Sequence, residues 1–133
     1  MEIKKEELKM KKRMTKPIIL IVEDDKYLQK FWKKLLKEVR VLSAYTVKQA
    51  EILFSSNRDK IELIAMDACV PGDAPTTLPL TREIRKVFKK PMVAMSSSSD
   101  YRKELLRAGC SHECPNKVFL TQEIIKILKK GVE

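Results

Sequence analysis

The sequence has few of the features that mark a small metabolic enzyme. Only three of its 133 residues are glycine and only one is histidine. No glycine-rich phosphate-binding loop is visible, nor a nucleophile paired with a base. These absences argue against an enzyme that turns over a metabolite.

Cysteines and long apolar runs are also scarce. The three cysteines, Cys69, Cys110 and Cys114, are an odd number without tight pairing, which argues against a disulfide framework and for a reducing compartment. The longest apolar run, residues 18–22, is too short to cross a bilayer. No apolar stretch follows the first residues, so no secretory signal is expected. We therefore expect a cytoplasmic protein without a membrane segment.

Charge is abundant and predominantly positive. The formal net charge is +10, and residues 1–16 hold seven Lys or Arg against three Glu. We expect residues 1–15 to form a basic, flexible N-terminal arm and residues 16–133 to form one domain. The positive charge has two interpretations: a solubilising surface, or weak and salt-sensitive association with nucleic acid.

Short apolar segments alternate with amphipathic segments throughout the domain. This alternation predicts a parallel sheet covered by helices on both sides, that is, an α/β fold. In such sheets ligands bind at the carboxyl ends of the strands, near the point where the strand order reverses. The strands are expected at residues 18–22, 39–44, 61–67, 91–95 and 112–115.

Two predictions concern the ends and faces of the helices. Tyr27, Phe31 and Trp32 recur at helical spacing, so we expect them in the core, with Trp32 partly exposed. Asp25 and Thr121 are polar residues at the expected starts of the first and last helices, where each is predicted to act as an N-cap.

Acidic residues gather where two predicted strands end. Glu23, Asp24 and Asp25 follow the first strand, and Asp67 ends the third. A single Asp in such a place usually caps a helix or forms a turn. Four carboxyl groups converging on one crevice would repel one another unless a cation shared the site, and Mg²⁺ prefers such oxygen ligands. The pattern therefore predicts a magnesium site.

Four motifs resemble the receiver domain of two-component response regulators. They are Ile-Leu-Ile-Val-Glu-Asp-Asp (19–25), Met-Asp-Ala-Cys-Val-Pro-Gly (66–72), Pro-Met-Val-Ala-Met-Ser (91–96) and Ala-Gly-Cys (108–110). Their order and strand-end positions carry the resemblance, which runs from about residue 17 to residue 130. It implies a flavodoxin-like (βα)5 sheet with strand order 2-1-3-4-5.

The resemblance also implies a function and a role for six residues. The domain would be a signalling switch rather than an enzyme, taking a phosphoryl group from a sensor histidine kinase or phosphotransfer protein and passing the signal to a target protein. Dimerisation is left open. The implied roles are Mg²⁺ ligands for Glu23, Asp24, Asp67 and the backbone carbonyl of Cys69, phosphoacceptor for Asp67, and contacts to the phosphoryl group for Ser96 and Lys117.

The sequence departs from the family pattern after the last predicted strand. Counting from Gly109 puts Asn116 at the position of the family's lysine, whereas a one-residue insertion restores Lys117, which we favour. The family's aromatic switch residue is missing, since Glu113 or Cys114 stands there. Two alternatives therefore stay open: a pseudo-receiver that binds partners without phosphorylation, and a small basic nucleic-acid-binding protein.

Overall fold

Strands and helices alternate along the chain, as the apolar pattern predicts. The structure is a computed structural model that describes residues 16–132, so the predicted arm at residues 1–15 lies outside the described residues. The strands are β1 (Ile18–Val22), β2 (Arg40–Ala44), β3 (Ile61–Asp67), β4 (Met92–Met95) and β5 (His112–Cys114). The helices are α2 (Lys26–Leu35), α3 (Val47–Asn57), α4 (Leu78–Val87), α5 (Ser99–Ala108), the 3₁₀ helix η1 (Lys117–Phe119) and α6 (Leu120–Val132).

The five strands form one parallel sheet in the order β2-β1-β3-β4-β5. This is the flavodoxin-like arrangement, and the predicted fold class is confirmed. Strand β1 lies between β2 and β3, so that Val22 at its carboxyl end pairs with Ala44 on one side and Met66 on the other. The strand order reverses at this point, and the ends of β1 and β3 therefore lie side by side.

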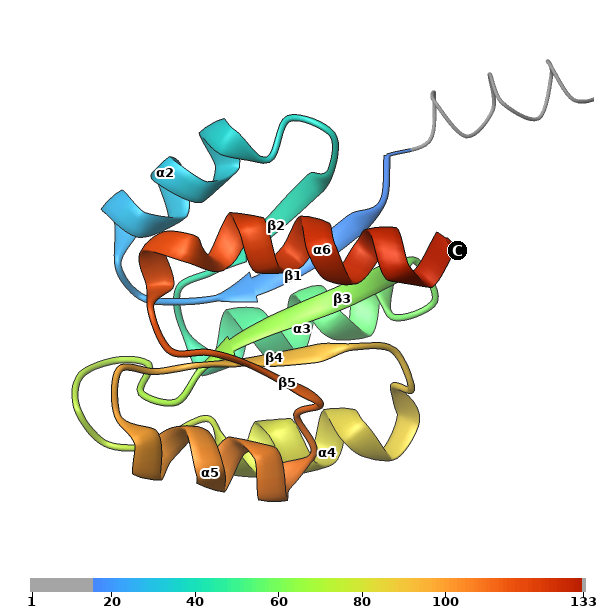
Figure 1. The fold of residues 1–133 in the computed structure, drawn as a ribbon. Helices are drawn as coiled ribbons and strands as arrows, with labels where there is room; N and C mark the ends of the chain where they lie inside the picture. Colours follow the sequence, from blue (N-terminus) through green and yellow to red (C-terminus); the bar gives the residue numbers. More distant parts are fainter. Residues whose placement is uncertain (1–15, 133) are drawn as a thin grey trace, which may run out of the picture.

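Helices cover both faces of the sheet (Figure 1). Helices α2 and α6 cover one face, where Trp32 and Ile124 pack in one core cluster. Helices α3, α4 and α5 cover the other face, where Phe54 and Ile84 belong to a second cluster. Residues 19–22 of β1 are completely buried because they contribute side chains to both clusters. The continuous apolar run in the sequence reflects this two-sided burial.

Helix α2 begins where Asp25 supplies its N-cap. The Asp25 carboxylate accepts hydrogen bonds from the backbone N–H groups of Tyr27 (2.9 Å) and Leu28 (3.1 Å), as predicted. The predicted core residues are only partly right, because Tyr27 is 87% exposed and Phe31 is 42% exposed. Trp32, expected to be partly exposed, is completely buried.

The chain approaches α6 differently from the prediction. Thr121 is not the N-cap, because helical structure already starts at Lys117 in η1 and continues into α6 from Leu120. The Asn116 side chain instead accepts a hydrogen bond from the backbone N–H of Val118 (3.0 Å). Within residues 16–132, none of the helices has the length and apolar character needed to cross a bilayer.

Candidate functional site

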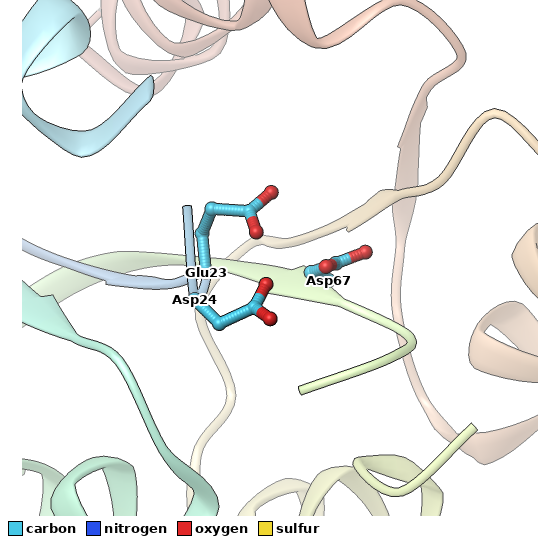
Figure 2. Close-up of side chains that lie close together, drawn as sticks. All are labelled: Glu23, Asp24 and Asp67. Atoms are coloured by element: carbon cyan, nitrogen blue, oxygen red, sulfur yellow. The ribbon is translucent and has the colours of Figure 1, made fainter. Parts of the chain in front are cut away.

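Three carboxylates converge at the carboxyl edge of the sheet. Glu23 and Asp24 follow β1, and Asp67 is the last residue of the neighbouring strand β3. One oxygen atom from each residue lies within 4.8 Å of the others, and Figure 2 shows the three side chains pointing toward one another. Asp25, the fourth predicted acid, is exposed and caps α2 instead.

Lys117 supplies a positive charge to these carboxylates. Its Nζ lies 2.5 Å from Glu23 Oε1 and 3.3 Å from Asp67 Oδ2. Asn116 faces η1 as its cap, so Lys117 rather than Asn116 reaches the acids. Helix η1 starts directly after Asn116 and directs Lys117 toward the acids. Counting along the sequence could not show where this helix starts, and so could not decide between Asn116 and Lys117.

Burial controls the electrostatics of this cluster. Glu23 is 1% exposed and Asp67 is 5% exposed. Burial raises the pKa of Glu23 from 4.5 to about 7, although the hydrogen bond from Lys117 opposes the shift. Burial also raises the pKa of Asp67, against the attraction of the Lys117 charge. Both carboxyl groups therefore lose their protons less readily than the same groups in water.

The neighbouring acids keep Lys117 in its charged form. Burial alone lowers the pKa of its ammonium group. The hydrogen bond to Glu23 and the charge of Asp67 outweigh burial, and the pKa of Lys117 rises above its usual value. Lys117 therefore stays charged throughout the ordinary pH range and acts as a fixed cation in the cluster.

The carboxylates line an open pocket of about 410 Å³. Ser96 and Cys69, two further predicted site residues, also line it. Ser96 follows β4, and its hydroxyl accepts a hydrogen bond from the backbone N–H of Ser98 (3.1 Å). The backbone N–H of Cys69 lies near the Asp67 carboxylate and slightly opposes the rise in the pKa of Asp67 that burial causes. The pocket thus brings together all six residues to which the sequence motifs assign a role, on one edge of the sheet.

Two threonines hold the loop after β3, and the sequence did not reveal them. The Thr77 hydroxyl donates to the backbone carbonyls of Asp67 (2.7 Å) and Ala68 (3.0 Å). The Thr76 hydroxyl donates to the carbonyl of Val70 (2.7 Å) and accepts from its N–H (3.0 Å). These bonds fix the backbone on which Asp67 is carried. Two adjacent threonines just before the proline-containing start of α4 are the only signal that the sequence offers for them.

A partly buried arginine also contacts the backbone of Ser96. Arg102 of α5 donates from Nη1 to the Ser96 carbonyl (2.7 Å) and from Nε to Glu113 Oε1 (3.3 Å). Glu113 is one of the two residues that stand where the family pattern has an aromatic residue. Glu113 of β5 thus forms an ion pair with Arg102, and Arg102 in turn binds the backbone at the end of β4.

A five-stranded parallel sheet in this order, with a polar pocket at the carboxyl ends of its strands, defines a flavodoxin-like α/β domain. No protein-family model matches the sequence, and a comparison with curated protein sequences finds no match. Comparison with solved structures does find matches, and they include response regulators.

Three of the similar structures span most of the chain. A two-component response regulator from Clostridium difficile is 24% identical, with a TM-score of 0.74, over 89% of this chain and 100% of that one. A CheY-like response regulator receiver domain protein from Methanospirillum hungatei is 25% identical, with a TM-score of 0.65, over 87% of this chain and 96% of that one. A response regulator from Burkholderia pseudomallei is 16% identical, with a TM-score of 0.66, over 86% and 66%. The chain therefore has the fold of response-regulator receiver domains, as its motifs predict.

Proposed function

We propose that this protein is a receiver domain that accepts a phosphoryl group on Asp67 in a Mg²⁺-dependent reaction and passes the signal to a partner protein. The observation that carries the proposal is the convergence of Glu23, Asp24 and Asp67 with Lys117 in one open pocket. A sensor histidine kinase or phosphotransfer protein would supply the phosphoryl group, which implies a cytoplasmic location. The Burkholderia structure supports this chemistry, since it holds a phosphorylated aspartic acid and a calcium ion.

The donor set of the pocket fits a hard divalent cation. Glu23, Asp24 and Asp67 offer carboxylate oxygens within 4.8 Å of one another, and Mg²⁺ favours such oxygens over nitrogen or sulfur. Burial raises the pKa of Glu23, and the nearby acids Asp24 and Asp67 raise it further, so a cation bound here would favour the ionised form. The backbone carbonyl of Cys69 is proposed as a further ligand. When bound, Mg²⁺ would neutralise the carboxylates and the oxygens of the incoming phosphoryl group.

Asp67 is the proposed nucleophile. One carboxylate oxygen attacks the phosphorus and forms a new P–O bond, while the bond from phosphorus to the donor breaks and its electron pair leaves with the donor. Lys117 is placed to pair with the equatorial oxygens, because its Nζ already contacts the Asp67 carboxylate at 3.3 Å. Fixed positive charge beside the reacting oxygen lowers the barrier mainly by electrostatic stabilisation.

Ser96 and Arg102 are proposed to carry the signal away from Asp67. A phosphoryl group adds charge and acceptor oxygens, so the Ser96 hydroxyl would exchange its bond with the Ser98 N–H for one to the phosphoryl group. Arg102 binds the Ser96 carbonyl and Glu113 together, so movement at Ser96 would reach α5 and β5. A target protein would then bind the rearranged surface.

Incubation with Mg²⁺ and a small phosphodonor such as acetyl phosphate tests the proposal directly. We expect intact-mass spectrometry to detect one added phosphoryl group in the wild type and none in Asp67→Asn. Asp73→Asn is the matched control, because Asp73 lines the same pocket but is not part of the carboxylate cluster. Phosphorylation of Asp67→Asn at the wild-type rate would contradict the assignment of the acceptor.

A pseudo-receiver is the second candidate function. Asp67 is only 5% exposed and already paired with Lys117, which is an arrangement that also suits a permanently unphosphorylated domain. The same experiment separates the two functions. Absence of any phosphoryl group at every Mg²⁺ concentration, in a folded wild-type protein, would favour a module that binds partners without phosphorylation.

A further inference from the structure

Helix α2 is tied to the site by two buried side chains. Gln29 donates from Nε2 to the carbonyls of Ile21 (2.9 Å), Glu23 (3.2 Å) and Ala44 (3.3 Å). Trp32 donates from its indole Nε1 to the backbone carbonyl of Lys117 (2.9 Å). Both side chains are completely buried, and their spacing of three residues places them on the same face of the helix. We call Gln29 and Trp32 the α2 clamp.

The α2 clamp holds the backbones of the two residues whose side chains pair in the pocket. Gln29 binds the carbonyl of Glu23, Trp32 binds the carbonyl of Lys117, and Lys117 Nζ lies 2.5 Å from Glu23 Oε1. One turn of one helix therefore fixes both ends of this ion pair. Asp25 directly follows Asp24 and caps the same helix, so the start of α2 is joined to the acidic residues.

The other hydrogen bonds that restrain the Lys117 backbone are local. The backbone N–H of Leu120 also donates to the Lys117 carbonyl, within the turn of η1. The Asn116 side chain caps the N–H of Val118, and the Cys114 thiol donates to the carbonyl of Asn116 (3.1 Å). The bond from Trp32 joins residues 85 positions apart. A lysine side chain is long and flexible, so the position of its ammonium group depends on where its backbone is held.

The Gln29 amide stabilises the core less than an apolar side chain of the same size would. Three carbonyls surround its Nε2, which fixes the orientation of the amide and leaves Oε1 buried with no hydrogen-bond partner among residues 16–132. A buried polar atom without a partner destabilises the fold, and a leucine of similar size would avoid that cost. Packing alone therefore does not account for Gln29, whereas holding the end of β1 does.

We propose that Gln29 and Trp32 are positioning residues that act through the backbones of Glu23 and Lys117 to place the lysine ammonium against the Asp67 carboxylate. This inference rests on the proposed phosphorylation of Asp67. The two residues touch neither the donor nor the phosphoryl group, and their contribution passes through Lys117.

A double-mutant cycle between residues 32 and 117 tests the inference. Trp32→Phe removes the N–H donor and keeps an aromatic ring. We expect phosphorylation by acetyl phosphate to slow roughly fivefold, the rate equivalent of about one net hydrogen bond. In a Lys117→Ala background, Trp32→Phe is expected to change the rate less than about twofold, since the group on which Trp32 acts is gone. Equal slowing in both backgrounds, or no slowing in either, would overturn the inference.

Phe31→Leu is the matched control for this cycle. Phe31 is the neighbouring aromatic residue of the same helix, and it is 42% exposed. Its substitution should leave the phosphorylation rate at the wild-type value. Slowing equal to that of Trp32→Phe would show that any change in α2 has this effect, which contradicts a specific role for the indole.

Two NMR measurements without Mg²⁺ separate this inference from the proposed function. The chain has one tryptophan, so its single indole N–H signal reports the bond, and we expect slow exchange with D₂O. Fast exchange would overturn the inference even if Trp32→Phe failed to fold. In protein with ¹³C-methylated lysines, the Lys117 signal, assigned by its loss in Lys117→Ala, should shift in Trp32→Phe. An unshifted signal overturns the inference, whereas an unreactive wild type overturns the proposed function.

Discussion

The two edges of the sheet carry opposite charges in different ways. At the amino edge a basic residue stands at or just before the start of four strands: Lys16, Arg40, Lys60 and Lys90. All four are exposed. At the carboxyl edge Glu23 and Asp67 are almost completely buried, and their carboxylates converge with that of Asp24.

This difference in burial decides what the charges contribute. The pair of Lys90 with Glu62 (3.0 Å) has both side chains 44% exposed, and such a pair is typically worth about 0–1 kcal/mol. At the carboxyl edge burial raises the pKa values of Glu23 and Asp67, and the neighbouring charges, which interact strongly in this buried setting, modify these shifts. The amino edge therefore favours solubility, and the carboxyl edge has the properties of a reactive site.

The largest expected effect comes from removing Lys117, the one lysine that lines the acidic pocket among residues 16–132. Lys117→Ala is expected to lower the rate of Asp67 phosphorylation by about two orders of magnitude, because a fixed charge beside the reacting oxygen is lost. Lys90→Ala removes a lysine from the amino edge, and it should leave the rate unchanged. Quench-flow or time-resolved mass measurement compares the variants. Equal phosphorylation rates in Lys117→Ala and Lys90→Ala would contradict a special role for the lysine at the carboxyl edge.

The second prediction uses pH. Because the pKa of Glu23 is raised from 4.5 to about 7, the folded protein binds more protons than the unfolded chain between these values. The stability of the metal-free protein should therefore fall as pH rises from about 4.5 to about 7, and the raised pKa of Asp67 acts in the same direction.

Mg²⁺ should reverse this loss by binding the ionised carboxylates. We expect millimolar Mg²⁺ to raise the midpoint of thermal unfolding by roughly 5 °C at pH 8 and to have little effect at pH 5. Differential scanning calorimetry at the two pH values measures both. The same increase at both values would contradict a role for ionised Glu23 in binding the ion.

The third prediction separates two acids within the carboxyl edge. Asp25→Ala removes the N-cap of α2 and should lower the free energy of unfolding by about 1 kcal/mol. The Mg²⁺ affinity of the folded protein should be unchanged, whereas Asp24→Asn should weaken it. Denaturant unfolding and a Mg²⁺ titration provide the two readouts. Weaker Mg²⁺ binding in Asp25→Ala would place this acid in the metal site.

The smallest effect on the phosphorylation rate is expected from removing charges at the amino edge, on the far side of the sheet from Asp67. A five-residue strand spans about 17 Å, which is roughly twice the Debye length of about 8 Å at physiological ionic strength. Replacing both Lys33 and Lys37, which line a groove on the amino-edge side, by Gln should change the phosphorylation rate less than about twofold at that salt concentration. A large change at physiological salt would indicate that the two edges communicate.

Burial and alternation made the fold predictable from the sequence. Short apolar runs such as residues 19–22 require cover on both faces, which a parallel sheet with helices on each side provides. Strand order came from the resemblance of the motifs, not from periodicity. Periodicity was misleading for Tyr27 and Phe31, because a helix face is wide and only its inner part, with Trp32 and Leu36, is buried.

The acids of the site were predictable, and the residues that hold them were not. Glu23, Asp24 and Asp67 follow apolar strands, which is a visible signal. Thr77 and Gln29 act through hydrogen bonds to backbone carbonyls, which leave no pattern in the spacing of residues. The choice between Asn116 and Lys117 depended on the residue at which η1 starts. A shift of one residue in the preceding loop would exchange the two side chains, and the sequence does not predict loop length that closely.

Lys117 gives the pocket a built-in counter-ion. A site of three crowded acids that relied wholly on a dissolved metal would become unstable each time the ion departed. Here a tethered ammonium group stays between Glu23 and Asp67 whatever the solution contains. If the proposed ion binds, the folded domain should not depend on it, and we expect the protein to withstand chelators such as EDTA without unfolding.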